Sequence, residues 1–214
     1  MPVAKAGPAG GGRSRDDLAE ERRAEIMAAA EQLLAVHGFD AMRLRDVAQQ
    51  AGVSIGLIQH YFATRDDLLF ETMRTASRRR ARQWVGLASG ARNAGDKITA
   101  LLEGAISDPH RCVVWLETCA ASSRHPELRR DVHLTQDAWR ETIRSAIDEG
   151  LAAGEFAPIL PIDDLVVLLV SLIDGLMLAT VTESATVTES AGEDGRAERT
   201  RLLRQTAGQL LGIR

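Results

Sequence analysis

The chain has 214 residues, of which 45% are hydrophobic and 26% charged, which is ordinary for a globular protein with a good core. Its two cysteines exclude a disulfide scaffold, and no leader with a cleavage site opens the sequence, so we expect a cytoplasmic protein. The net charge of −4 excludes a uniformly basic surface, so any attraction to nucleic acid must be local. Residues 1–82 carry a small basic excess and residues 83–214 an acidic one.

The N-terminal segment, residues 1–15, is rich in proline, glycine and alanine and is predicted to be a disordered arm. A solubilising tail is the favoured interpretation, and a basic arm lying near DNA phosphates is the alternative. The first helix is predicted from Asp16 to His37, because apolar side chains recur there at helical spacing and acidic residues crowd its first turns. Gly38 to Arg43 is predicted to form the bend into the next helix.

The stretch from Leu44 to Phe62 is predicted to form two short helices joined by a three-residue turn. Apolar residues fall on one face of the first helix, Gly52 ends it without a Cβ clash, and Ser54 can cap the second. The side chains predicted to face the core are Val53, Ile58 and Phe62, and those predicted to face outward are Ile55, Gly56, Leu57, Gln59, His60 and Tyr61. A buried hairpin of an unrelated α-protein is the alternative, but it would not need polar and aromatic groups outside. The pattern therefore favours a helix-turn-helix whose second helix enters a DNA major groove.

Several motifs between Arg22 and Leu69 follow one another in a characteristic order. They are Asp46-Val47-Ala48, Ala51-Gly52-Val53-Ser54, His60-Tyr61-Phe62 and Arg65-Asp66-Asp67-Leu68-Leu69. Their order and spacing resemble the amino-terminal domain of the tetracycline-repressor (TetR) family. The resemblance implies a three-helix DNA-binding domain over residues 16–65, with its motif at residues 43–62. The residues that it implies at the DNA are Arg43, Arg45, Ser54, Ile55, Gly56, Leu57, Gln59, His60, Tyr61 and Arg65.

These residues are expected to contact DNA in different ways. Leu57 can meet a thymine methyl group, and His60 can bond a base edge or a phosphate. Arg65 begins a helix at a position where relatives usually place a lysine against the DNA backbone. A cation is unfavourable at a helix N-terminus, so a non-structural reason for it is favoured. Relatives usually have Thr or Ser where this chain has Arg43, which leaves Asp40 as the nearest candidate cap for the second helix.

A long helix is predicted from Arg65 to about Leu87. It carries five arginines, which are Arg74, Arg78, Arg79, Arg80 and Arg82. A solvated linker face is the favoured interpretation of this row, and proximity to the DNA backbone is the alternative. Further helices are predicted over residues 97–106, 108–123 and 127–153.

The most apolar run of the chain, from Leu165 to Thr180, is predicted to be a helix buried in a bundle. A membrane span is the alternative, but the run is too short and contains Asp174-Gly175. Residues 180–185 recur letter for letter as residues 186–191, and such a duplication is expected in an exposed loop. A last helix is predicted over residues 196–211. The two final helices are expected to pack against a second copy as a four-helix bundle.

The chain is thus predicted to be all-α, with a larger helical ligand-binding and dimerisation domain over residues 66–214. Within that domain, Trp115-Leu116-Glu117, His125-Pro126-Glu127-Leu128 and Trp139 resemble the betaine-regulator-like (BetI-type) branch of the family. The resemblance implies a small-molecule pocket near Trp115, Cys119, Trp139, Asp174 and Met177. For any one of these residues, a place in the core is the favoured interpretation.

We find no sequence motif for catalysis, and the spacing of Cys112 and Cys119 supports neither a zinc site nor a redox pair. We therefore expect no enzyme, no metal, no cofactor and no membrane partner. The predicted function is a ligand-responsive transcriptional repressor that binds a near-palindromic double-stranded operator as a homodimer and leaves it when a small-molecule effector binds. The alternatives are a helical small-molecule-binding protein or enzyme with a vestigial motif, and a cysteine-based redox-sensing regulator.

Overall fold

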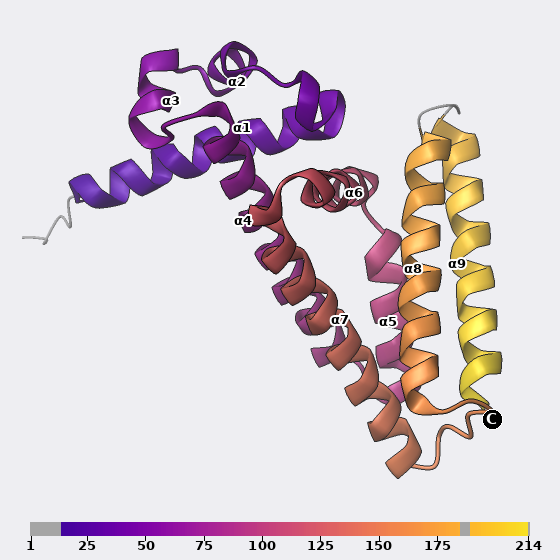
Figure 1. Ribbon diagram of the computed structural model, residues 1–214. Helices are drawn as coiled ribbons and strands as arrows, with labels where there is room; N and C mark the ends of the chain where they lie inside the picture. The colour runs from indigo at the N-terminus through magenta and orange to yellow at the C-terminus, as the bar shows by residue number, and fades with distance from the viewer. Residues whose placement is uncertain (1–13, 185–188, 214) are drawn as a thin grey trace, which may run out of the picture.

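The computed structural model describes residues 14–184 and 189–213, and the predicted arm of residues 1–13 lies outside these ranges. Helices are the regular structure of the described part, as the sequence predicts (Figure 1). They are α1 (Arg15–Ala41), α2 (Leu44–Ala51), α3 (Ile55–Tyr61), α4 (Arg65–Ser89), α5 (Ala94–Ile106), α6 (Pro109–Arg124), α7 (Pro126–Ala152), α8 (Ile162–Ser184) and α9 (Glu189–Leu211).

The predicted helix-turn-helix is present with the predicted bounds. Gly52 takes the left-handed conformation, with φ 64° and ψ 34°, and its N–H closes the end of α2. Ser54 is the N-cap of α3, because its hydroxyl oxygen accepts from the Leu57 N–H at 3.1 Å. Both signals act over a few residues, which is why the sequence alone located the turn.

The bend before α2 is also present, but its cap differs from the prediction. Gly38 has φ 73° and ψ 175°, and it interrupts the helical backbone of α1 three residues before the helix ends at Ala41. Arg43 is the N-cap of α2, and no side chain caps that helix. The prediction that Asp40 caps α2 is wrong, because Asp40 lies within the last turn of α1. Its carboxylate instead pairs with Arg124 of α6 at 3.4 Å.

The row of arginines on α4 is not simply a solvated face. Arg74 Nε donates to Asp131 of α7 at 2.9 Å, and Arg79 pairs with Glu31 of α1. Arg80 donates to the backbone of α5 and is described with the second domain below. The interpretation as a solvated linker face is therefore wrong for these three residues, whose side chains connect α4 to three different helices.

Two hydrophobic cores meet along α4. The first holds α1–α3 together and continues along α4 to Ala76, and it includes Val114 and Ala121 of α6. The second lies between α4, α5, α6, α7, α8 and α9, and contains Trp84 and Trp139. Residues of α6 belong to both cores. A shift of α6 in the second domain would therefore also displace side chains that pack against α1–α3, which we call the head.

The last two helices lie side by side at the edge of the molecule away from α1–α3 (Figure 1). α9 begins at Glu189 rather than at residue 196, and α8 continues to Ser184. The first repeat copy therefore extends α8, and the prediction of an exposed loop is wrong for residues 180–184 and 189–191, while residues 185–188 lie outside the described residues. Thr180 is fully buried, and its hydroxyl donates to Leu176 O at 2.8 Å, which satisfies the polar group inside the helix pair.

The length argument against a membrane span does not hold. The segment Ile162–Thr182 has 21 residues and a mean hydropathy of 2.3, so by length and composition it could cross a membrane. Packing within the chain accounts for part of its apolar composition, because 39% of the segment is buried. Leu165, Leu169, Ile173 and Met177 are fully buried against the second core.

Candidate functional site

The outer face of α3 carries the side chains that the sequence places there. Ile55 is 43% exposed, and Gly56, Gln59 and His60 are also exposed. Leu57 and Tyr61 are half-buried, and the His60 and Tyr61 rings pack edge to face with centroids 5.2 Å apart. The inward set is also confirmed, since Ile58 and Phe62 are buried and Val53 packs against the same core. The core thus fixes which face of α3 a partner can reach.

Two exposed arginines, Arg43 and Arg45, lie at the start of α2. Arg43 is exposed, and its backbone forms the N-cap position. The Arg45 side chain is 67% exposed, and its Nε lies 3.3 Å from Asp46 Oδ1. The exposed ion pair of Arg45 is weak, so its guanidinium can still bind a phosphate oxygen. The exposed Arg43 side chain can do the same.

Arg65 has a structural role that the sequence reasoning missed. Its Nε donates to Met42 O at 2.7 Å, and its Nη2 donates to Phe39 O. The guanidinium also lies 5.0 Å from the centroid of the Phe39 ring and 2.6 Å from Asp66 Oδ1. These contacts join the bend after α1 to α4, and they explain a cation at this helix N-terminus without DNA. Contact of Arg65 with DNA stays a prediction.

The bend also contacts the second domain through α6. The Phe39 N–H donates to Glu117 Oε2 at 3.0 Å, and a Cβ on Gly38 would lie 3.3 Å from Glu117 Oε1. The His125 ring, just after α6, packs on Phe39 and Phe70 with centroids 4.8 and 5.1 Å away. The attachment of the head is therefore built around one glutamate and a small aromatic cluster.

The residues predicted to line an effector pocket lie in the second core. Trp139 and Met177 are fully buried, and Trp115 is 3% exposed. Trp115 packs on Trp139 with centroids 4.9 Å apart, and Trp84 stacks on Trp139 at 5.3 Å. The structure therefore brings the predicted tryptophans together and adds Trp84, which the sequence reasoning did not single out.

Cys119 and Asp174 lie near the same cluster and are both half-buried. Burial raises the pKa of the Cys119 thiol to about 12, with the Asp174 charge adding to the effect and Arg80 opposing it. Since the thiolate is the reactive form of cysteine, this environment disfavours a redox-sensing role for Cys119.

Arg80 is the charged residue of this region that the sequence reasoning did not place here. Its Nη2 donates to Ala105 O at 3.0 Å, and its guanidinium carbon lies 5.2 Å from the Trp139 ring centroid. A signal was present, because Met73, Ser77, Arg80 and Trp84 follow one another at helical spacing on the buried face of α4. Arg80 stands among Arg78, Arg79 and Arg82, and this run of arginines hides the spacing.

Two cavities adjoin Arg80, and both are also lined by Gln83 and Arg111. The smaller has a volume of about 20 Å³ and reaches Trp115, and the larger has about 310 Å³ and reaches Trp84. Of the five predicted ligand-binding residues, Trp115 lines one of these two cavities, and Cys119, Trp139, Asp174 and Met177 line neither.

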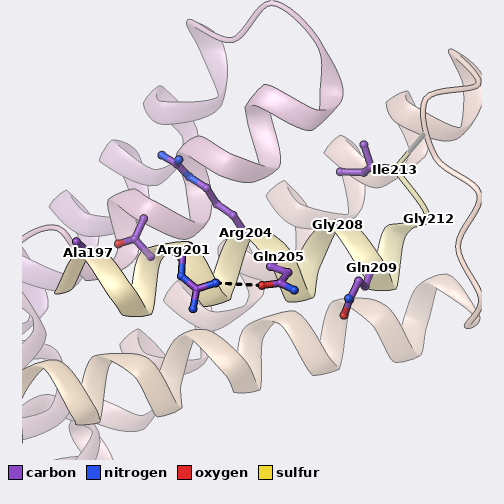
Figure 2. A pocket seen from close by; sticks show the side chains of 9 residues that line it. Ala197, Arg201, Arg204, Gln205, Gly208, Gln209, Gly212 and Ile213 are labelled. Carbon is purple, nitrogen blue, oxygen red and sulfur yellow. Dashed lines mark hydrogen bonds between the residues drawn. The ribbon is translucent and has the colours of Figure 1, made fainter. Parts of the chain in front are cut away.

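A third hollow is an open groove of about 940 Å³ along α9. Figure 2 shows its lining residues spread along α9 and just past its end, at Gly212 and Ile213, and Arg201 Nη1 donates to Gln205 at 3.3 Å. Arg204 reaches away from the groove and pairs with Glu103 of α5. A shallow groove lined by one helix fits a flat partner surface better than an enclosed small molecule.

Two family models match the chain. One, described as BetI-type transcriptional repressor, C-terminal, matches residues 91–205, and the other, described as bacterial regulatory proteins, tetR family, matches residues 26–72. The chain belongs to the TetR family, and its second domain is of the BetI type. This confirms the family and the fold class expected from the sequence. Because the TetR family is one of transcriptional regulators, it also confirms that the chain is not an enzyme.

Curated relatives agree with this assignment. The HTH-type transcriptional regulator BetI of Agrobacterium fabrum is 27% identical over 131 residues, which is 59% of this chain and 64% of that protein. BetI of Cronobacter sakazakii is 30% identical over 168 residues, which is 73% of this chain and 78% of that protein. The chain thus spans less than two thirds of the first of these relatives and more than two thirds of the second.

Solved structures show the same fold. A TetR transcriptional regulator of Chloroflexus aurantiacus is 24% identical with a TM-score of 0.75, and the match covers 91% of this TetR-family chain and 98% of that one. A protein of Saccharomonospora viridis in complex with choline is also 24% identical with a TM-score of 0.75, covering 90% and 96% of the two chains. At this identity the likeness concerns the fold alone.

Proposed function

We propose that this TetR-family protein is a cytoplasmic transcriptional repressor that binds operator DNA through α3 and is released by a small-molecule effector. The observation that carries the proposal is the exposure of the Gln59 and His60 face above a core sealed by Ile58 and Phe62. Polar side chains on the second helix of a helix-turn-helix are the groups that read base edges in a major groove.

The remaining DNA contacts follow from position. Arg43 and Arg45 lie at the start of α2 and would bind phosphates on one side of the groove. The Ser54 hydroxyl accepts the cap hydrogen bond and keeps its own O–H free to donate to a phosphate oxygen. Tyr61 is half-buried beneath the face, so its hydroxyl would reach the backbone rather than a base. The proposed interface therefore combines a few base-reading groups with several positioning contacts.

We further propose that two copies pair through α8 and α9. Large apolar side chains remain on the outer side of this helix pair, with Val167 58%, Leu178 53% and Leu202 52% exposed. Leaving such groups in water is unfavourable, and a second copy would cover them through a two-fold interface. Two heads related by that axis would read a near-palindromic operator.

The effector is proposed to act through α6. Trp115 and Arg111 of this helix line the cavities, whereas Glu117 of the same helix holds the Phe39 N–H at 3.0 Å. A ligand that prefers a shifted α6 would move the attachment of the head and lower the population that fits the operator. The choline complex of the Saccharomonospora viridis protein supports the idea that this fold accepts small molecules.

The alternatives have less support. The raised pKa of Cys119 counts against the redox-sensing regulator. A helical carrier with a vestigial motif would not need exposed Gln59 and His60 on the outer face of α3. Membership of a family of regulators also favours the repressor.

A gel shift with the DNA upstream of the protein's own gene tests the proposal. The double variant His60→Ala with Tyr61→Ala is expected to lose at least tenfold in operator affinity while the protein stays folded, because His60 is exposed and Tyr61 only partly packs against the first core. The matched control is His133→Ala with Leu134→Ala, an exposed pair on α7. Retained binding in the first variant, or no retardation of any upstream DNA by the folded dimer at low salt, contradicts the proposal.

A further inference from the structure

The Arg80 side chain places a positive charge inside the second domain without an acidic side chain at ion-pair distance among the described residues. Its Nη2 donates to Ala105 O at 3.0 Å and lies 2.9 Å from Met177 Sδ. Its Nε–H is buried and has no acceptor within the part of the chain that the structure describes. Since a buried charge is costly unless it is paired, an anion would be stabilised at this position.

The Arg80 guanidinium is itself the cation that packs over the aromatic cluster. The guanidinium carbon lies 5.2 Å from the centroid of the Trp139 ring, which is the distance at which a cationic ligand would sit over that ring. Trp84 and Trp115 pack against the same ring, with centroids 5.3 and 4.9 Å away. A quaternary ammonium entering this cluster would have to displace the arginine or remain beside a like charge.

The larger cavity has the lining that a small organic acid needs. Its volume is about 310 Å³, and its described lining contains two arginines, Arg80 and Arg111, and no acidic residue. Arg111 Nη1 donates to Gln83 Oε1 at 3.1 Å and its Nε lies 2.9 Å from Asp108 Oδ2, so this guanidinium is held in place and its charge is already paired, which leaves Arg80 as the main anchor for an anion. Trp84 and Leu87 supply an apolar wall. This volume lies at the lower end of the range of ligand sites, roughly 300–1,000 Å³.

Burial lowers the pKa of Arg80, and the Cys112 side chain and the charge of Asp108 oppose that effect, whereas Asp174 of α8 is not among the groups that shift it. Burial raises the pKa of the Asp174 carboxyl, and the charges of Arg80 and Arg140 oppose that effect. The carboxyl makes no ion pair with Arg80 among the described residues. Arg80 is therefore the arginine of this cavity that has no ion-pair partner among the described residues, whereas Arg111 is paired with Asp108.

We propose that the effector of this protein is a small organic carboxylate with an apolar body, whose carboxylate is held by Arg80 with Arg111 beside it, and whose apolar part lies against Trp84 and Leu87. The inference rests on the proposed function, because it names the chemical class of the effector. Arginine suits this role, since its planar group donates two parallel hydrogen bonds to a carboxylate. The site discriminates against choline-like cations by charge.

Intrinsic fluorescence reports on this site directly, because the three tryptophans of the chain are Trp84, Trp115 and Trp139. The purified full-length protein is titrated with three probes that share a benzyl group, namely phenylacetate, phenylacetamide and benzyltrimethylammonium, and separately with choline. Phenylacetate is expected to give a saturable change with a Kd at least tenfold below those of the neutral amide and of both cations. This ranking is measured on the unaltered chain and needs no variant.

The Arg80→Gln variant tests the assigned partner. It is expected to weaken phenylacetate binding at least tenfold while changing the affinity for the amide less than twofold. Arg82→Gln is the matched control, because Arg82 is an exposed arginine two residues away on α4 that lines neither cavity. The control is expected to bind phenylacetate like the unaltered protein.

Three results would overturn the proposal: tighter binding of either cation, an advantage of the anion over the amide that survives in folded Arg80→Gln, or no saturable carboxylate signal up to about 10 mM. The proposed function is measured separately by the operator gel shift without a ligand. Operator binding with failed carboxylate binding would overturn only the effector class. Carboxylate binding with no operator binding would overturn only the repressor function.

Discussion

Gly38 allows a quantitative test of how the head is attached. Its φ of 73° and ψ of 175° belong to a region that glycine almost alone occupies, so Gly38→Ala is expected to introduce strain of about 1–3 kcal/mol. The new Cβ would lie 3.3 Å from Glu117 Oε1, and the carboxylate would have to move by a few tenths of an ångström. That movement weakens the 3.0 Å hydrogen bond from the Phe39 N–H, for a further loss on the order of 1 kcal/mol.

Together these effects lower the free energy of unfolding by about 2–4 kcal/mol. For a chain of this size each kcal/mol corresponds to roughly 2–4 °C, so the expected fall in Tm is about 4–16 °C. Differential scanning calorimetry measures it. Gly86→Ala is the control, because Gly86 lies inside α4 with no atom within 4 Å of a built Cβ, and alanine there should stabilise by ~0.5–1 kcal/mol. If Gly38→Ala melted at or above the temperature of the unaltered protein, the strain argument would be refuted.

Two further predictions concern the second domain. Because burial raises the pKa of Cys119 from 9.0 to about 12, the unfolded thiol ionises first, and stability should fall as pH rises between these values. Cys119→Ser should flatten that part of the Tm–pH curve, and an unchanged slope would count against the assignment. If the proposed α8–α9 dimer forms, Val167→Asp with Leu178→Asp should convert it into a monomer, because a charge is placed on two exposed apolar positions of the interface. Light scattering after size exclusion measures the mass, and a dimer that persists contradicts the α8–α9 interface.

The features predicted well from the sequence are those that a few neighbouring residues determine. Gly52 ends α2 and Ser54 caps α3 through contacts within four residues, so the turn could be located without tertiary information. The inward and outward faces of α3 follow from helical spacing alone, which is why Ile58 and His60 were assigned to the correct sides.

The predictions that were wrong or incomplete involve partners far away in the chain. Arg74 meets Asp131 57 residues later, and Arg80 meets Met177 97 residues later, so nothing near either arginine indicated its partner. The duplicated segment was expected to be a loop because an insertion is tolerated best in an exposed loop with few contacts. Pairing of α8 with α9 instead lets the first copy continue as helix to Ser184.

By itself, the sequence determined that the protein is helical, that a helix-turn-helix occupies residues 44–62, and that its polar face points outward, because helix periodicity and capping are local properties. Only the tertiary structure decided that Arg80 enters the tryptophan cluster and that Glu117 holds the bend at Phe39. Both contacts arise when helices distant in sequence pack against each other, and the charge and shape of the proposed effector site depend on that packing.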